Sequence, residues 1–154
     1  AAAIAAGLPA VVADPADLAA RTAMLEGACL AGRCLLNAGM GVHHGLSQLV
    51  GGRTGIPHGL ANAVILAHAL RFNAEAVPDE VRRLGAVIEA PDDPAAAVSA
   101  LVGRLGLPTR LADCGVTLDD LDAVARAAPG NGSVRTNPRP VSEDDARAIL
   151  SAAY

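Results

Sequence analysis

The chain has 154 residues, of which 52% are hydrophobic, and it contains 35 alanines but only one Phe, one Tyr and no Trp. Its formal net charge is -4, it has no Lys, and it lacks the basic and aromatic surface that nucleic-acid binding needs. No run of 18 uninterrupted apolar residues is present, so no transmembrane helix is predicted. The composition favours strong helix formers, and we expect a single all-α, helical bundle-like domain over residues 1–154.

The first half of the chain predicts three helices. Asp14 with Pro15 resembles an N-cap and first turn, and a helical rhythm continues from there to Gly39. A second helix is expected over residues 42–50, ending at two consecutive glycines. Pro57 opens the third, whose segment 61–72 is almost wholly apolar. A helix that is apolar on nearly every side is expected at the centre of the domain.

The second half shows the start signals of four shorter helices. These signals are Pro78 with Asp79, Asp93 with Pro94, Thr117 with Asp120, and Ser142 with Asp145. The last two pairs have the spacing of a capping box, with Asp in place of Glu. Between them, residues 129–133 are expected to form a flexible turn and residues 137–140 a stiff extended segment. No segment alternates as a strand does.

Three of the four histidines lie within residues 43–58, in a stretch rich in glycine. His44 and Gln48 are four residues apart, so on a helix they lie on one side. The glycines allow the chain to reverse, and Pro57 places His58 at the start of the next helix. Two antiparallel helices joined in this way can bring His44 and His58 together.

Two imidazoles supply half of the ligands of a divalent metal site. No Asp or Glu lies between Glu26 and Glu75, so the other ligands would have to come from elsewhere. The alternative is that these histidines only pack and donate hydrogen bonds to the backbone. His68, on the apolar helix, is expected to be a core or rim residue.

The three cysteines form no Cys-x-x-Cys motif, which is typical of thiols that pack in a reducing compartment. We therefore expect a cytoplasmic protein. The chain does not begin with Met, so we also expect it to be processed or to belong to a longer polypeptide.

Four stretches carry a resemblance to a known family. They are GVHHGLSQLVGGRTGIPHGLANAVILAHALRFN, preceded by DPADLAARTAMLEGACLAG and followed by GLPTRLADCGVTLDDLDAVARAA and TNPRPVSEDDARAILSAAY. In this order they resemble the iron-containing alcohol dehydrogenases, and most of all the maleylacetate reductase branch. The resemblance covers nearly the whole chain and implies the C-terminal helical domain of a two-domain enzyme, a dehydroquinate synthase-like fold. The N-terminal NAD(P)-binding domain is absent from this chain.

The resemblance implies hydride transfer between a nicotinamide cofactor, NAD or NADP, and a small carbonyl, alcohol or maleylacetate-like substrate. His44 and His58 match the family's two C-terminal metal histidines, which bind Fe²⁺ or Zn²⁺. Maleylacetate reductases are regarded as metal-independent, and there the matching histidines would bind the substrate instead. Many members have a His near the proton path at the position of Gln48, and Gln cannot act as an acid or base. His43 is therefore the candidate acid or substrate contact, with Gln48 lining the cleft.

Several further expectations follow from the resemblance. The full-length enzyme is expected to be a homodimer with no membrane or nucleic-acid partner. The isolated chain should neither bind NAD(P) well nor complete a metal site, so it is expected to be inactive alone. The alternative is a non-catalytic helical scaffold or assembly module that has kept the fold, which Gln48 and the missing ligands favour.

Overall fold

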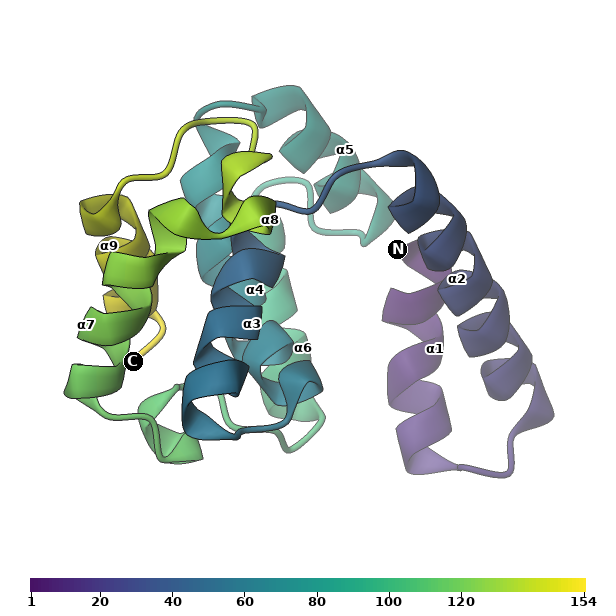
Figure 1. Ribbon diagram of the computed structural model, residues 1–154. Coiled ribbons are helices and arrows are strands. Elements are labelled where there is room, and N and C mark those ends of the chain that lie inside the picture. The colour runs from purple at the N-terminus through teal and green to yellow at the C-terminus, as the bar shows by residue number, and fades with distance from the viewer.

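The computed structural model describes residues 1–154, which form helices and connecting turns without a strand (Figure 1). This confirms the expected all-α fold. None of the helices combines the length and the apolar character needed to cross a lipid bilayer. The elements are α1 (Ala2–Ala13), α2 (Leu18–Asn37), α3 (Val42–Thr54), α4 (His58–Ala74), α5 (Pro78–Val87), α6 (Pro94–Arg104), η1 (Ala112–Cys114), α7 (Leu118–Ala127), η2 (Ala128–Gly130), α8 (Gly132–Arg135) and α9 (Glu143–Ala152).

Helices α1 and α2 form an antiparallel hairpin that stands to one side of the other helices (Figure 1). The two helices approach closely because Gly27 has no side chain: a Cβ there would lie 2.6 Å from Cγ1 of Ile4. Only Gly7, Ala20 and Gly27 of the hairpin are buried. The hairpin therefore has no large buried side chain of its own.

The start of α2 differs from the prediction. Asp17, not Asp14, is its N-cap, and the Asp17 carboxylate accepts hydrogen bonds from the backbone N–H groups of Ala19 and Ala20. Asp14 instead follows the end of α1, a helix that the sequence had not predicted, and its carboxylate accepts from the N–H of Ala16. Both Asp residues are good caps, so the sequence alone did not decide between them.

Helices α3 to α9 form a bundle around α4, which packs against α3, α5, α6 and α9. This confirms the central place predicted for the apolar helix. The hydrophobic core contains no residue of α1 or α2. Its members come from α3, α4, α7, α9 and the connections between them: Val42, Leu46, Val50, Ala61, Val64, Ile65, Ala69, Leu111, Val116, Leu121, Val124, Ala125, Ala128, Val134, Ala146, Ile149, Leu150 and Ala153.

The segment predicted as a flexible turn before residue 134 is instead ordered as η2 and α8. The side chain of Asn131 accepts hydrogen bonds from the N–H groups of Ser133 and Val134 and so caps α8. Val134 is buried against α3. Long-range packing therefore orders a segment whose local composition favours a turn.

Both predicted capping boxes are present and confirmed. Thr117 and Asp120 exchange hydrogen bonds at the start of α7, and Ser142 and Asp145 do so at the start of α9. These hydrogen bonds are the main cause that lowers the pKa of Asp120 and of Asp145 below the usual value, and Arg53 and Arg139 lower them further. Each cap is therefore strongest when its carboxylate is ionised.

We expect the free energy of unfolding to fall as the pH drops below about 4. A carboxylate with a lowered pKa in the folded state contributes stability above its unfolded pKa and loses it as the pH falls through the folded pKa. Asp145→Asn should flatten this acid limb in urea unfolding measured from pH 6 to about pH 2. Asp92→Asn is the control, because Asp92 is exposed and has no hydrogen-bond partner. If the wild type and Asp145→Asn lose stability equally between pH 6 and about pH 2, the Asp145 cap does not cause the loss of stability in acid.

Candidate active site

The turn between α3 and α4 sets the position of two histidines. Helix α3 runs to Thr54, past the two glycines at which its end was predicted, and Gly55 closes it in the left-handed conformation with φ 77°. The N–H of Gly55 donates to the carbonyl of Gly51. Pro57 then acts as the N-cap of α4, so His58 is the first residue of that helix. The reversal returns α4 alongside α3.

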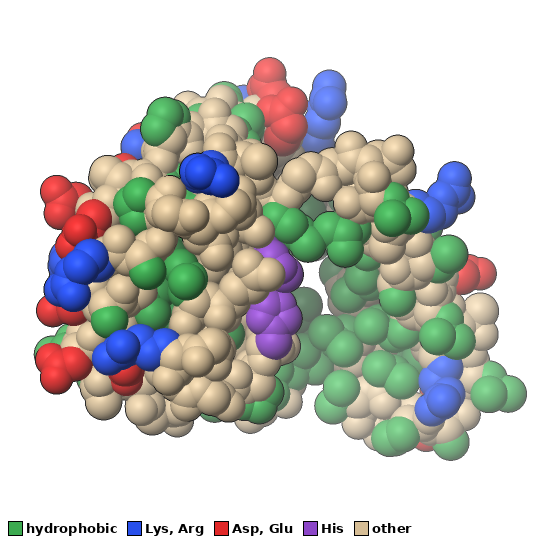
Figure 2. All heavy atoms as spheres, in the orientation of Figure 1, with side chains coloured by type: hydrophobic (Ala, Val, Ile, Leu, Met, Phe, Trp, Pro, Cys, Tyr) green, Lys and Arg blue, Asp and Glu red, His purple; other side chains and the backbone are tan.

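His44 and His58 meet across this pair of helices. Their ring centroids are 5.0 Å apart and the ring planes make an angle of 80°, an edge-to-face contact. His44 is half-buried and His58 exposed. Figure 2 shows histidine side chains gathered on the side of the bundle that faces the α1–α2 hairpin. Burial, and then repulsion from His58, lowers the pKa of His44 below its usual value, which favours the neutral ring.

His43 points to the backbone of α4. Its Nε2 lies 2.9 Å from the carbonyl oxygen of Asn62. Because a carbonyl can only accept, Nε2 carries the proton and Nδ1 is the free basic atom of the neutral ring. Burial lowers the pKa of His43 more than the hydrogen bond to Asn62 raises it, and repulsion from His44 and His58 lowers it further. His43 is therefore a half-buried group beside the His44–His58 pair, and its lowered pKa favours the neutral ring.

Asn62 is a polar residue of this region that sequence reasoning missed. Its Nδ2 donates to the carbonyl of His58, while its Oδ1 is buried without a hydrogen-bond partner. The available signal was an Asn in an apolar helix, four residues after His58. A buried acceptor without a partner is rare, and Asn62 Oδ1 is the one such side-chain atom in this structure.

Gln48 follows His44 by one turn of α3 and makes no hydrogen bond to a histidine. It is exposed and lines a hollow of about 470 Å³ between α3 and α7, together with Arg53 and Ala127. Arg53 is held there by an ion pair of 2.6 Å between its Nε and the carboxylate of Asp120. The place of Gln48 in the catalytic cleft, as a residue that substitutes for an acid or base there, stays a prediction.

The residues of this chain do not make a complete metal site. No group of three or more His, Cys, Asp or Glu side chains comes together, so His44 and His58 stand as two donors at most. A stable divalent site needs three or four ligands. Their predicted role as metal ligands therefore needs donors from outside these 154 residues.

His68, which contacts neither ring of the pair, lies further along α4. Burial, and then the positive charge of Arg71, lowers the pKa of His68.

Asn137 joins the start of α3 to the end of α4. Its Oδ1 accepts hydrogen bonds from the N–H of Val42, at 3.0 Å, and from Nδ2 of Asn73, at 3.1 Å. Its Nδ2 donates to Oδ1 of Asn73, at 2.8 Å, and to the carbonyl of Arg139. The guanidinium of Arg139 lies 4.1 Å from the ring centroid of Phe72 and completes the joint. The first turn of α3, which carries His43 and His44, is fixed by this joint.

Asn137→Ala is expected to lower the free energy of unfolding by about 1–2 kcal/mol, because it leaves Val42 N–H and the Asn73 side chain without their partners. Urea unfolding followed by circular dichroism measures this change. Asn37→Ala is the matched control, since Asn37 is exposed and bonds only within its own helix, and it should shift stability by less than about 0.5 kcal/mol. Equal effects of the two substitutions would show that the joint does not stabilise the fold.

Comparison with known proteins places the chain in a family. The sequence model described as "Fe-containing alcohol dehydrogenase family, C-terminal" matches residues 1–154. The chain therefore belongs to the Fe-containing alcohol dehydrogenase family and corresponds to its C-terminal domain, as the resemblance in sequence predicted.

Individual relatives agree with this placement. Maleylacetate reductase 1 of Rhodococcus opacus is 38% identical over 152 residues, which is 99% of this chain and 42% of the relative. The crystal structure of maleylacetate reductase from a Rhizobium strain has a TM-score of 0.89 at 36% identity, covering 99% of this chain and 43% of that one. Alcohol dehydrogenase from Oenococcus oeni has a TM-score of 0.93 at 29% identity, with the same coverage. The chain thus spans about two fifths of the length of these proteins.

Proposed function

We propose that this chain is the helical domain of an NAD(P)-dependent oxidoreductase that reduces a maleylacetate-like substrate or a small carbonyl compound. The single observation that carries the proposal is the His44–His58 pair, 5.0 Å apart on an accessible side of the bundle. Family membership and the names of the relatives support an oxidoreductase. The cofactor would bind outside this chain, which has no glycine-rich strand–turn–helix of its own.

The role of the pair follows from the charge that develops in the reaction. When a hydride reaches a carbonyl carbon, or the double bond conjugated with a carbonyl, negative charge grows on the substrate oxygen. An imidazole N–H aimed at that oxygen stabilises the charge in the transition state, which is a large effect in catalysis. His44 and His58 are suited to this role because their rings are in contact on an accessible side of the bundle, so both can face one bound substrate oxygen. His43 would hold the neighbouring backbone through Nε2 and keep Nδ1 free as an acceptor.

The proposed role of the histidine pair does not depend on a metal ion, because His44 and His58 alone do not complete a metal site. If Fe²⁺ or Zn²⁺ is bound with the help of further donors, His44 and His58 are the residues of this chain that would hold it. Gln48 cannot move a proton at neutral pH, so the proton delivered to the product must come from another group. We further propose that the whole enzyme is a cytoplasmic homodimer.

The competing proposal is a helical module that serves assembly without catalysis. One observation favours it: Gln48 stands where an acid or base is usual in the family. An assembly module would not need the two histidine rings to be accessible. The two proposals therefore differ in whether reduction occurs and in whether it depends on the pair.

The test is an assay of the longer protein that the gene encodes around residues 1–154. NADH or NADPH oxidation is followed by absorbance with maleylacetate and with a panel of short aldehydes and ketones. The oxidoreductase proposal predicts turnover with at least one of these substrates. No turnover with any of them, with the protein folded and nicotinamide bound, would support the assembly module instead.

A further inference from the structure

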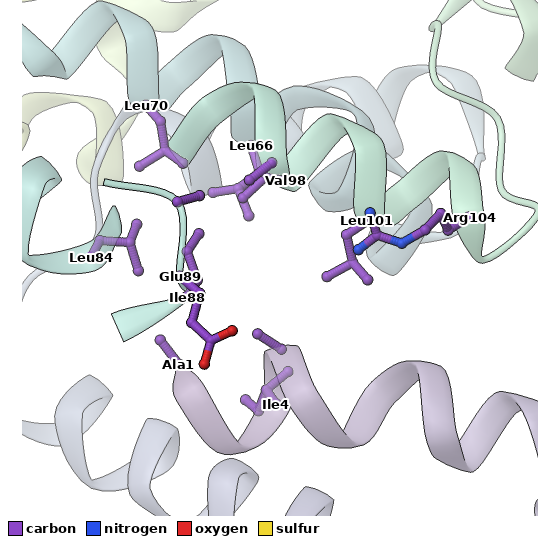
Figure 3. Close-up of a pocket in the computed structure, with 13 residues that line it drawn as sticks. Ala1, Ile4, Leu66, Leu70, Leu84, Ile88, Glu89, Val98, Leu101 and Arg104 are labelled. Atoms are coloured by element: carbon purple, nitrogen blue, oxygen red, sulfur yellow. The ribbon is translucent and has the colours of Figure 1, made fainter. Parts of the chain in front are cut away.

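The hollow beside the first turn of α1 lacks the groups that would recognise a polar molecule. It has a volume of about 490 Å³ and aliphatic walls, and Glu89 and Arg104 are its only charged residues. These two side chains project from separate elements and do not converge (Figure 3). Recognition of a small polar molecule needs a few polar groups that point to one place. A polar ligand must therefore be sought elsewhere on the molecule.

The hollow between α3 and α7, of about 470 Å³, combines polar side chains with small apolar walls. Arg53 is the one charged residue in its lining, and Gln48 is the other polar side chain there. The remaining lining residues are Leu49, Gly52, Ala123, Val124 and Ala127. The lining thus carries a positive charge and no negative one, which suits an anionic group attached to a short carbon chain.

Arg53 keeps hydrogen-bonding capacity beyond its ion pair with Asp120. The bond of 2.6 Å runs from Nε of Arg53 to Oδ1 of Asp120. No hydrogen bond or ion pair engages Nη1 or Nη2 of Arg53, and 45% of its side chain is exposed. Arginine binds a carboxylate through two parallel N–H groups of its planar guanidinium. The bond to Asp120 therefore orients the guanidinium and leaves both Nη groups for a ligand.

Asp120 is itself held in place by the start of α7. Its Oδ2 accepts hydrogen bonds from the backbone N of Thr117, at 3.0 Å, and from Oγ1 of Thr117, at 2.7 Å. The carboxylate that orients Arg53 is thus fixed by two further donors. Because Asp120 cannot follow a movement of Arg53 without breaking this cap, the guanidinium is preorganised at the edge of the hollow.

Gln48 connects the hollow with the histidine pair. It lines the hollow and follows His44 by one turn of α3. At a rise of 1.5 Å per residue, the Cα atoms of His44 and Gln48 are about 6 Å apart along the helix axis. The ring of His44 contacts that of His58, and the amide of Gln48 can donate hydrogen bonds to a carboxylate. One short molecule can therefore reach both the histidine pair and the hollow.

We propose that this hollow is a carboxylate subsite, in which Arg53 and Gln48 bind an acid group that the substrate carries a few carbons from its reacting carbonyl. The substrate class is then a short-chain oxo acid. Gly52, Ala123 and Ala127 have small side chains or none, so they leave room for the carbon chain. The subsite rests on the proposed function for the reaction, whereas binding of the carboxylate needs no turnover. Arg53 is thus a residue that determines specificity.

The first measurement is the binding of succinate to the longer protein by isothermal titration calorimetry. We expect Arg53→Gln to raise the Kd of succinate about tenfold or more, because it removes the charge and the paired N–H groups. Arg53→Lys keeps the charge without the planar pair and should lie between the two. The control is Arg126→Gln, which removes an exposed arginine of α7 that does not line the hollow. Equal affinities of the wild type and Arg53→Gln, or no binding to the wild type, would overturn the subsite.

The second measurement compares the reduction of succinic semialdehyde with that of butanal, which has a methyl group in place of the carboxylate. Arg53→Gln should lower kcat/KM about tenfold or more for succinic semialdehyde and change it by less than about threefold for butanal. Equal losses with both substrates would give Arg53 a merely structural role and overturn the subsite.

The subsite and the proposed function fail in different ways. Succinate binding that depends on Arg53, in a protein that reduces no carbonyl compound, would leave the carboxylate site standing and remove the proposed function. Reduction of butanal by a protein whose succinate binding does not depend on Arg53 would keep the function and remove the subsite. Circular dichroism of each variant shows whether the fold is kept.

Discussion

In the longer protein, His58→Ala is expected to lower kcat/KM for nicotinamide-dependent reduction by about 100-fold or more, or roughly 2.7 kcal/mol of transition-state stabilisation. His58 is the first residue of α4 and its ring contacts that of His44. Its removal takes away one of the two groups that can polarise the substrate oxygen, or one donor of a metal site that other residues complete. The loss is expected under either form of the proposal.

The control for this prediction is His68→Ala. His68 lies ten residues further along the same helix, and it should leave kcat/KM within about threefold. Circular dichroism and the unfolding midpoint of both variants show whether the fold is kept. Turnover of His58→Ala within about tenfold of wild type, or about 1.4 kcal/mol, would remove His58 from the mechanism.

Gly45→Ala should lower the free energy of unfolding by about 2–3 kcal/mol, a large effect for the addition of one methyl group. A Cβ at Gly45 would lie 2.5 Å from Cγ2 of Val134, 2.9 Å from Oδ1 of Asn131 and 3.1 Å from the backbone N of Val134. Val134 is buried and Asn131 caps α8, so neither can move without breaking other contacts. The overlap would separate α8 from the turn of α3 that carries His43 and His44.

Gly52→Ala is the matched control for Gly45→Ala, in the same helix. Apart from its chain neighbours and the local backbone of α3, no atom lies within 4 Å of a Cβ at Gly52. Alanine is a better helix former than glycine, so this variant should gain about 0.5–1 kcal/mol in urea unfolding. The account therefore predicts opposite signs for one chemical change at two places. A loss of stability in both variants, or in neither, would contradict the packing described around α8.

Local signals in the sequence predicted much of the fold. The all-α class followed from composition and period, and the central place of α4 followed from its apolar run. The capping boxes at Thr117 and Ser142 were predicted because both partners lie three residues apart. The errors arose where two local signals competed or where distant packing decided. Asp14 and Asp17 are both good caps, and α8 forms where Asn131 and Val134 dock on α3.

In the candidate site, too, local sequence signals predicted some residues correctly, whereas the positions of others depend on long-range packing. His44 and His58 are separated by one short reversal, so glycine and proline in that turn were enough to predict that the rings meet. Asn137 could not be found in this way, because it bonds to Val42 across 95 positions of sequence. Asn62 was visible in the sequence, but its buried Oδ1 depends on the packing around it. The position of Gln48 in a hollow beside α7 likewise depends on how α3 and α7 pack.

The most direct test of the central claim is a double-mutant cycle on kcat/KM in the longer protein. If His44 and His58 act as one unit on the same substrate oxygen or the same metal, either alanine substitution alone removes most of the effect. The double variant His44→Ala/His58→Ala should then be no more than about threefold slower than the slower single variant. Losses that multiply, or single variants that keep turnover within about tenfold of wild type, would contradict the claim.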